Sequence, residues 1–300
     1  MEYFLELVFS GLTRGSIYAL IALGYTMVYG IIGLINFAHG EIYMIGAFTA
    51  LIIATVLNMY GLPLPAILIL ASVAAIIWSA AYGFTVERLA YRPLRGAPRL
   101  SPLISAIGMS IFLQNYVMLA QTPNFLPFPA LIPDLPFLNR FTSMVGTTDL
   151  AILLVTAIVM ILLTLMIKFT RTGKAMRATS QDRTMAFLVG VNVDTVISVT
   201  FITGSSLAAI GGVLIASHIG QINFYIGFIA GIKAFTAAVL GGIGSIPGAV
   251  LGSFVLGLTE SFATGYVSSA YEDVFAFLLL VLILIFRPAG LLGRATIEKV

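Results

Sequence analysis

The stretch Leu34-Ile35-Asn36-Phe37-Ala38-His39-Gly40-Glu41-Ile42-Tyr43-Met44-Ile45-Gly46 interrupts an otherwise apolar part of the chain. The chain is almost uninterruptedly apolar from Ile17 to Leu34 and apolar again from Ile42 to Leu57. Between these runs an amide, an imidazole and a carboxylate occur within six residues. Such a polar group indicates either the water-facing end where two membrane spans meet or a backbone that opens to line a pathway.

The composition of the 300-residue chain points to lipid as its solvent. Hydrophobic residues make up 60% of the sequence and charged residues only 9%, whereas a soluble domain carries roughly 25% charged residues. Apolar runs of about 20 residues recur, which matches a bilayer core of roughly 30 Å. The alternating polarity of a membrane β-barrel is missing from the sequence. We therefore predict an all-α polytopic membrane protein with one transmembrane domain over residues 1–300.

The apolar runs predict about 8–10 transmembrane helices. We expect spans at about 12–33, 39–59, 63–86, 102–120, 149–168, 195–217, 227–241, 246–260 and 273–287.

Two segments are expected to be broken or re-entrant, near 34–46 and near 240–248. The second contains Gly241, Gly242, Gly244, Pro247 and Gly248, a composition that disfavours a continuous helix. When the halves of the chain are aligned on each other, the two segments correspond weakly, which suggests an internal repeat. Glycine- or proline-interrupted segments in corresponding halves often mark a transport pathway.

Positive charge predicts the orientation in the membrane. Loops 87–101 and 169–194 and the tail 288–300 carry most of the Lys and Arg residues, so the positive-inside rule makes all three cytoplasmic. The proline-rich loop 121–148 is then external, and the N-terminus is outside. The net charge is only +3 and is confined to short loops, so we expect no nucleic-acid partner.

Small residues recur at a spacing of four, the spacing at which helices approach closely in lipid. We expect these residues to pack helix against helix: Gly46, Ala50 and Ala54; Ala71, Ala75, Ser79 and Gly83; Gly204, Ala208 and Gly212; Gly244, Gly248 and Gly252.

Several absences limit the chemistry of the chain. No G-x-x-x-x-G-K-[ST] motif occurs, and no G-x-S-x-G or H-E-x-x-H. Cysteine is absent and there are two histidines, so we predict no catalytic, cofactor or metal site.

Ionisable residues within the apolar runs are few: Arg14, His39, Glu41, Lys233 and Glu260. Most lie near expected span ends, where long side chains can reach the interface. An ion-coupled carrier usually needs acidic groups or histidines in mid-membrane, so we expect the energy for transport to come from outside this chain. The segment Gly173–Val191 has helical apolar spacing and is either a surface helix on the headgroups or a docking helix for a cytoplasmic motor subunit.

Five stretches resemble the permeases of branched-chain amino acid ABC importers. They are Gly15–Gly30, Ile35–Glu41, Glu87–Arg95, Ile104–Gly108 and Ala237–Ala249. The motifs are long, occur in the family's order and extend over most of the chain. Loop 121–148 matches least.

The resemblance implies a subunit of the bacterial inner membrane with several partners. These are a second homologous permease, two cytoplasmic ATP-binding subunits and a periplasmic amino-acid-binding protein, with ATP bound at the partner subunits. The family's R-A-x-x-x-D-x-x-x-A-x-x-x-G pattern is matched at Arg177, Ala178, Asp182, Ala186 and Gly190. By analogy these residues form the coupling helix that seats in the ATP-binding subunit.

We therefore expect the permease subunit of an ATP-driven importer for leucine, isoleucine and valine. Two alternatives stay open: an ABC permease for another amino acid, an amide, urea or a sugar, and an ion-coupled secondary carrier. The expected pathway elements are the residues of the two broken segments: Asn36, His39, Gly40, Glu41, Gly241, Gly242, Gly244, Pro247 and Gly248.

Overall fold

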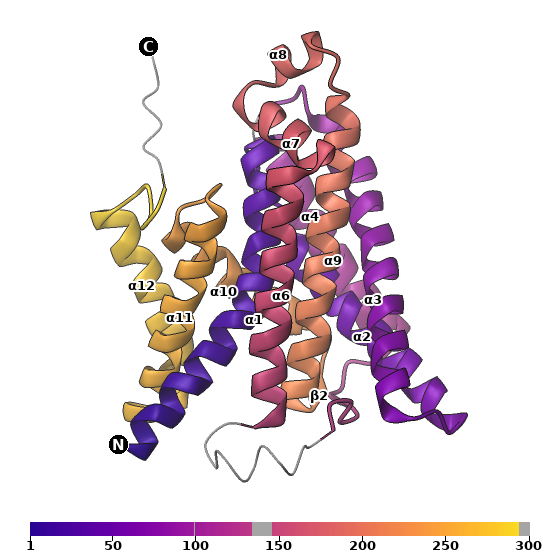
Figure 1. Ribbon diagram of the computed structural model, residues 1–300, viewed down its shortest axis with the longest axis vertical. Coiled ribbons are helices and arrows are strands. Elements are labelled where there is room, and N and C mark those ends of the chain that lie inside the picture. Colours follow the sequence, from indigo (N-terminus) through magenta and orange to yellow (C-terminus); the bar gives the residue numbers. More distant parts are fainter. Residues whose placement is uncertain (99, 134–145, 294–300) are drawn as a thin grey trace.

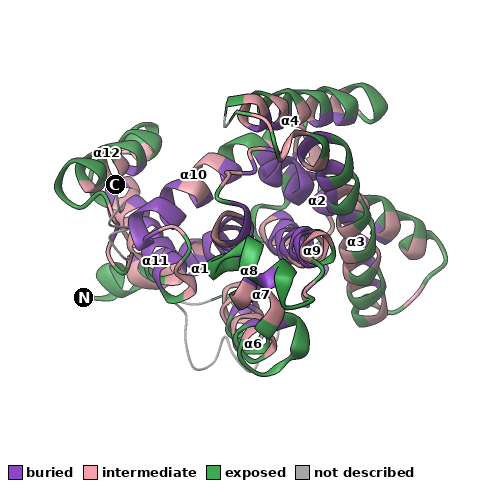
Figure 2. Cartoon of the chain, turned by 90° about the horizontal axis from the view of Figure 1, so that it is seen from above, coloured by how far each residue is buried: buried purple, intermediate pink, exposed green. Residues whose placement is uncertain are grey.

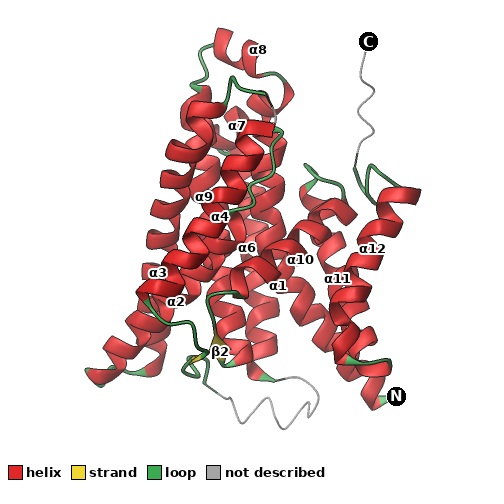
Figure 3. Ribbon diagram, turned by 180° about the vertical axis from the view of Figure 1, so that it is seen from behind, coloured by secondary structure: helices red, strands yellow, loops and turns green. Residues whose placement is uncertain are grey.

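The computed structural model describes residues 1–98, 100–133 and 146–293. Figures 1 and 3 show a bundle built almost entirely of helices, which confirms the predicted all-α class. Arg99, residues 134–145 of the predicted external loop and residues 294–300 of the predicted tail lie outside the described residues.

The elements follow one another along the chain with two short strands between helices. They are α1 (Glu2–Ile32), α2 (His39–Met59), α3 (Leu64–Val86), a π turn (Glu87–Tyr91), a 3-10 turn (Arg92–Leu94), α4 (Leu100–Ala120), β1 (Leu126–Pro127), α6 (Thr147–Phe169), α7 (Arg171–Gln181), α8 (Arg183–Leu188), α9 (Val193–Ile219), β2 (Gln221–Ile222), α10 (Ile226–Gly241), α11 (Ile246–Tyr266), a 3-10 turn (Ser269–Tyr271) and α12 (Glu272–Phe286).

Among the described residues, eight helices are long and apolar enough to cross a membrane, and α10 is a shorter apolar helix. This number confirms the predicted 8–10. The first helix begins at Glu2 instead of near residue 12, because its first turns pack on α11. The Tyr3 hydroxyl donates to the Gly265 carbonyl (2.8 Å) and the Ser261 hydroxyl to the Leu7 carbonyl (2.6 Å).

Helix α1 lies at the centre of the bundle. Its residues are buried almost without exception from Gly15 to Val28, as expected for a helix that is hydrophobic on all sides. Helices α6, α9, α10 and α11 pack around it. In the view from above, α3, α4, α6 and α12 lie at the rim and turn exposed faces outward (Figure 2).

Small residues join the helices, as the spacing predicts, except at Gly244, which lies in the turn before α11 with open space where a Cβ would stand. On α3, the stripe Ala71, Ala75, Ser79 and Gly83 makes up most of the buried face. One close crossing is between α1 and α11, where a Cβ on Gly15 would lie 2.9 Å from the Cα of Phe254. Close backbone approach through small residues is what holds helices together in lipid.

The two ends of the bundle differ. Helices α7 and α8 and the last described residues lie at one end, called the α8 end, and the N-terminus lies at the other, called the N-terminal end (Figure 1). At the α8 end the two basic loops meet. Arg92 pairs with Asp194 (2.6 Å), and Arg95 contacts both Asp194 and Glu87. At the N-terminal end β1 pairs with β2 in an antiparallel ladder.

Candidate functional site

The first break joins α1 to α2 over residues 33–38. It is shorter than the predicted segment 34–46, because α2 is already helical from His39. Helix α1 ends at Gly33, whose backbone is left-handed (φ 68°) and whose N–H donates to the Tyr29 carbonyl (2.7 Å). Glycine is the usual residue at this position of a helix end, because it has no Cβ to clash.

Asn36 holds the corner closed. Its side-chain oxygen accepts hydrogen bonds from the backbone N–H of Ala38 (3.2 Å) and the Tyr91 hydroxyl (3.1 Å). The residue is 1% exposed, and its side-chain nitrogen has no hydrogen-bond partner among the described residues. A buried amide group without a hydrogen-bond partner costs free energy of folding. This corner is therefore a buried polar turn and not one that water surrounds.

His39 lies inside the bundle. Its imidazole occupies the space that a Cβ on Gly24 of α1 would need, lies 3.6 Å from where a Cβ on Gly204 of α9 would stand, and packs on the Tyr25 ring (centroids 4.9 Å apart). Gly24 lies about two helical turns before the end of α1. The side chain at the start of α2 therefore lies beside the interior of α1 and not beside its last turn.

Glu41 lies two residues after His39, in the first turn of α2, and is also 1% exposed. Its Oε1 accepts a hydrogen bond from the Ser110 hydroxyl of α4 (3.1 Å), and its Oε2 has no hydrogen-bond partner among the described residues. The neighbouring Gly40 packs tightly on Gly227 and Gly231 of α10. The expectation that hydration at the membrane surface could account for this polar group is wrong, because the structure buries it.

The second break covers residues 242–245 only. Gly241 is the last residue of α10, and Pro247 and Gly248 belong to α11, so the prediction of a break across 240–248 is too wide. Proline is tolerated in the first helical turn, where its missing N–H would have no partner. Gly242 (φ 105°) and Gly244 (φ 91°) make the turn.

The chain after α12 closes this second break. The N–H groups of Leu291 and Leu292 donate to the carbonyls of Leu240 and Gly241 (2.9 Å each). These carbonyls belong to the last turn of α10, which lacks partners within its own helix. The second break is therefore a tight turn between α10 and α11 at the α8 end, and the chain after α12 packs on it.

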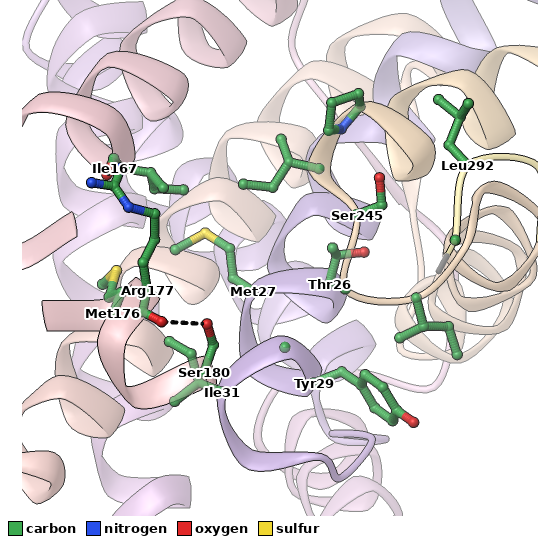
Figure 4. Close-up of a pocket in the computed structure, with 16 residues that line it drawn as sticks. Thr26, Met27, Tyr29, Ile31, Ile167, Met176, Arg177, Ser180, Ser245 and Leu292 are labelled. Carbon is green, nitrogen blue, oxygen red and sulfur yellow. Dashed lines mark hydrogen bonds between the residues drawn. The ribbon is translucent and has the colours of Figure 1, made fainter. Parts of the chain in front are cut away.

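A cavity of about 660 Å³ lies beside the second break. Figure 4 shows side chains around it from the last turns of α1, the end of α6, helix α7, the turn between α10 and α11, and the chain after α12. It brings Arg177 together with Gly244 and Pro247, all predicted as site residues. Thr26 and Tyr29 also line it and were not predicted. Their signal was weak: two polar side chains in the last turns of an apolar helix.

The segment predicted to couple to a partner forms two helices. They meet at Asp182, whose backbone is extended and whose carboxylate accepts a hydrogen bond from the Met185 N–H (3.0 Å). Aspartate is among the best N-cap residues. The helical spacing across Gly173–Val191 suggested one amphipathic stretch, and the cap at Asp182 divides it.

Helix α7 is fastened to the bundle. The Arg177 guanidinium donates to the carbonyls of Ile167 (2.6 Å) and Lys168 (3.2 Å) at the end of α6. Met176 and Thr179 are buried, and Ala178 is half-buried. A side chain that binds the last carbonyls of one helix fixes the angle at which the next begins.

Helix α8 presents apolar side chains outward. Met185, Phe187, Leu188 and Val189 are 61–77% exposed, while Ala186 is buried. Gly190 (φ 87°) ends the helix in a left-handed conformation, with open space where a Cβ would stand. Exposed apolar clusters of this kind are typical of protein–protein or membrane contact sites.

Arg183 links α8 to α1. Its Nε donates to the carbonyl of Ile31, in the last turn of α1 (3.0 Å). Partial burial and then the positive charge of Arg95 lower the pKa of Arg183, but a guanidinium stays protonated at neutral pH. The charged side chain thus connects the tip of the bundle to the helix that precedes the first break.

Three of the ionisable residues found in the apolar runs belong to one network that joins α1, α10, α11 and α12. Lys233 of α10 contacts Glu260 of α11 (3.3 Å) and Glu272 and Asp273 of α12 (2.7 and 2.9 Å). Arg14 of α1 also pairs with Glu272 (2.9 Å). Sequence reasoning treated these charges as separate, because the chain separates them by tens to hundreds of residues.

Comparison with known families gives one match over most of the chain. The sequence profile described as branched-chain amino acid transport system / permease component matches residues 7–284.

Curated relatives match over almost their full length. The permease protein LivH of the high-affinity branched-chain amino acid transport system of Escherichia coli is 50% identical over 99% of this chain and 98% of its own. The corresponding BraD protein of Pseudomonas aeruginosa is 53% identical over the same shares. A probable LivH protein of Methanocaldococcus jannaschii is 27% identical over 91% of this chain and 88% of its own. Among solved structures, PsaBC from Streptococcus pneumoniae in complex with a Fab aligns at a TM-score of 0.48 and 14% identity, over 93% of this chain and 91% of that one, a value that does not establish a shared fold.

Proposed function

Because the chain belongs to the family of branched-chain amino acid transport system permease components, we propose that it forms, with a second homologous permease, the membrane pathway of an ATP-driven importer. Its cargo is leucine, isoleucine and valine. A periplasmic binding protein selects the cargo and two separate ATP-binding subunits supply the energy. The absence of a Walker motif from the sequence supports this division of labour.

In this proposal the α8 end faces the cytoplasm of a bacterial inner membrane. The basic side chains of both basic loops gather there, including Arg92, Arg95, Arg177 and Arg183. The acidic residues Glu2 and Glu6 lie at the N-terminal end. This asymmetry is the one that the positive-inside rule describes, and it supports an external N-terminus and a cytoplasmic C-terminus.

The observation that carries the proposal is the exposed apolar surface on α8. Met185, Phe187, Leu188 and Val189 stand in water at the α8 end unless a partner covers them. A partner surface that buries such a cluster gains roughly 25 cal/mol for each Å². We assign this cluster, with Asp182, Ala186 and Gly190 shaping it, to docking on an ATP-binding subunit.

Movement of α8 has two routes into the bundle. Arg183 reaches the end of α1 at Ile31, and Arg177 reaches the end of α6 at Ile167. Both helix ends border the 660 Å³ cavity, which also contacts the second break. We propose that this cavity is the inner mouth of the pathway and that motor closure changes its shape through these two arginines.

Replacing an apolar side chain of α8 with a charged one tests this assignment. Phe187→Asp should abolish co-purification with the ATP-binding subunits, because the carboxylate would lose water on docking without gaining a partner. The folded permease should still insert into the membrane and elute as a single species, since Phe187 is 69% exposed. Binding of the ATP-binding subunits by Phe187→Asp at the wild-type level would contradict the docking assignment.

Phe187→Leu is the matched control. It keeps an apolar side chain at the same position, so assembly should fall by much less than in Phe187→Asp. Equal loss in both variants would mean that the position requires a phenylalanine for a reason other than apolar contact.

A further inference from the structure

The first break lies beside a second cavity, which has no part in the proposed docking surface on α8 or in the proposed inner mouth of the pathway. It has a volume of about 120 Å³ and lies between α4, α10 and the corner before α2. Its walls are largely aromatic and aliphatic, including Phe37, Phe228 and Phe235, with the polar groups of Tyr25 and Ser110. Phe37 and Tyr25 each pack on Phe235, with ring centroids 5.9 and 6.3 Å apart. A small apolar cavity with few polar groups has the features of a ligand subsite.

Glu41 lies directly behind two residues of this wall. Its Oε1 accepts the hydrogen bond from Ser110 (3.1 Å), and its Oε2 faces Gly227, where a Cβ would stand 2.8 Å away. Ser110 and Gly227 both line the cavity. A small shift of α4 or α10 would therefore expose a carboxylate oxygen to the cavity.

The carboxylate has no cationic partner among the described residues. Lys233, on the same helix as Gly227, is engaged with Glu260, Glu272 and Asp273 instead. Burying a carboxylate with one neutral hydroxyl as its partner is costly. An ionisable group in mid-membrane that is not paired with the protein itself is by default a functional group.

We infer that Glu41, Ser110 and the aromatic cavity form a transient subsite for the ammonium group and the apolar side chain of an amino acid in transit. The single free carboxylate oxygen complements one ammonium group, and the aromatic rings suit both a cation and a branched side chain. A bare metal cation would need more oxygen ligands than the Glu41, Ser110 and Tyr25 oxygens near this cavity. This inference rests on the proposed function, because it takes an amino acid as cargo.

The absence of cysteine from the sequence allows a direct test in the complete transporter. Ser110→Cys places one thiol in the cavity wall, and Gln121→Cys, exposed just beyond the end of the same helix, is the control. Both variants are reconstituted with all partner subunits. Each is treated with a cationic (trimethylammonium) and, separately, an anionic (sulfonate) thiosulfonate reagent. The treatment is done once without nucleotide and once with ATP while hydrolysis is blocked. Modification of this chain is followed by mass spectrometry.

The thiol at position 110 should react in at least one state, and faster with the cationic reagent than with the anionic one, relative to position 121. Adding Glu41→Gln should lower this preference by about tenfold, since a nearby carboxylate attracts one reagent and repels the other. Leucine should protect the thiol better than 4-methylpentanoate, which lacks the amino group. No reaction in any state, an unchanged charge preference, or equal protection by the two compounds would overturn the subsite.

Uptake separates this inference from the proposed function. Glu41→Gln alone, with assembly and ATP hydrolysis intact, should reduce the rate of leucine uptake about tenfold. Wild-type uptake by Glu41→Gln would overturn the subsite and leave the importer proposal standing. Failure of the wild-type complex to take up leucine with ATP would overturn the importer proposal instead. If Glu41→Gln does not assemble, the thiol protection at position 110 with an intact Glu41 still decides the question.

Discussion

At the scale of single residues, the arrangement around Lys233 is the clearest case of a charge that the bundle has to pair. Its side chain is 7% exposed and that of Glu260 is fully buried. The Tyr18 hydroxyl donates a hydrogen bond to Oε2 of Glu260 (2.7 Å), and Lys233 contacts its other oxygen, Oε1 (3.3 Å). Removing one member of a buried ion pair leaves the other charge without compensation, which is more costly than replacing both.

Lys233→Met should therefore lower the free energy of unfolding by about 3–5 kcal/mol. The double variant Lys233→Met/Glu260→Gln should recover much of this loss, since it removes the uncompensated carboxylate. Thermal unfolding of the purified protein in detergent measures both. A double variant no more stable than the single one would contradict the assignment of Glu260 as the partner.

Lys168→Met serves as the control for the loss of a lysine. Lys168 is exposed at the end of α6, and exposed substitutions usually change stability by less than about 0.5 kcal/mol. A loss as large as that of Lys233→Met would show that the effect does not depend on burial.

These residues show how far sequence reasoning reaches at this scale. Arg14, Lys233 and Glu260 could be identified, because a charge stands out in an apolar run. Their pairing could not be predicted, since it depends on where α10 and α11 lie in space. His39 and Glu41 were likewise identified, but a position between two spans suggested a surface location, and the packing of α2 against α1, α4 and α10 buries them instead.

At the scale of helices, close packing through small residues determines which helices meet. Gly15 lies against the backbone of α11, where a Cβ would be 2.9 Å from the Phe254 Cα and from the Ser253 oxygen. Gly30, on the same helix, borders the larger cavity, where the nearest atom to a Cβ, the Gly244 Cα, would be 3.8 Å away. The two glycines thus have different roles within one helix.

Gly15→Ala should lower the free energy of unfolding by about 1–3 kcal/mol, because the backbone of α11 has to move. Gly30→Ala should be neutral or should stabilise by up to about 1 kcal/mol, since alanine favours the helix and meets no obstacle. Thermal unfolding of both variants in the same detergent gives the comparison. Equal shifts in the two variants would contradict the account of the α1–α11 crossing.

The helices themselves were largely predictable, because bilayer-length apolar runs have few other solutions. The errors lie at their ends, where tertiary contacts decide. Tyr3 and Leu7 extend α1 by bonding to α11, and Pro247 begins α11 where a break was expected. The division at Asp182 was visible as an N-cap residue, but helical spacing on both sides of it masked the signal.

At the scale of the whole molecule, α1 connects the parts of the candidate site. Its outer half carries Arg14 and Tyr18 of the charge network, and Gly24 receives His39. Its last turns line the larger cavity and accept the hydrogen bond from Arg183. A displacement at α8 therefore has a continuous route of contacts to the first break, which is what a pathway gated from the cytoplasm needs.

Much of this arrangement was beyond the reach of sequence. The resemblance pointed to Arg177 and Gly190, and glycine content pointed to Gly244 and Pro247. That Arg177, Gly244 and Pro247 border one cavity follows from the folding of α7 against α1, which no motif encodes. The internal repeat between the two halves stays a prediction.

The central claim is that transport through this chain is driven by ATP hydrolysis on separate subunits, and leucine uptake into proteoliposomes tests it most directly. The vesicles contain this chain, the second permease, the ATP-binding subunits and ATP, with the binding protein added outside. We predict uptake that stops when ATP is depleted, that persists when an uncoupler removes ion gradients, and that is lost when this chain is left out. Uptake that survives ATP depletion and collapses with the uncoupler would contradict the account and identify an ion-coupled carrier.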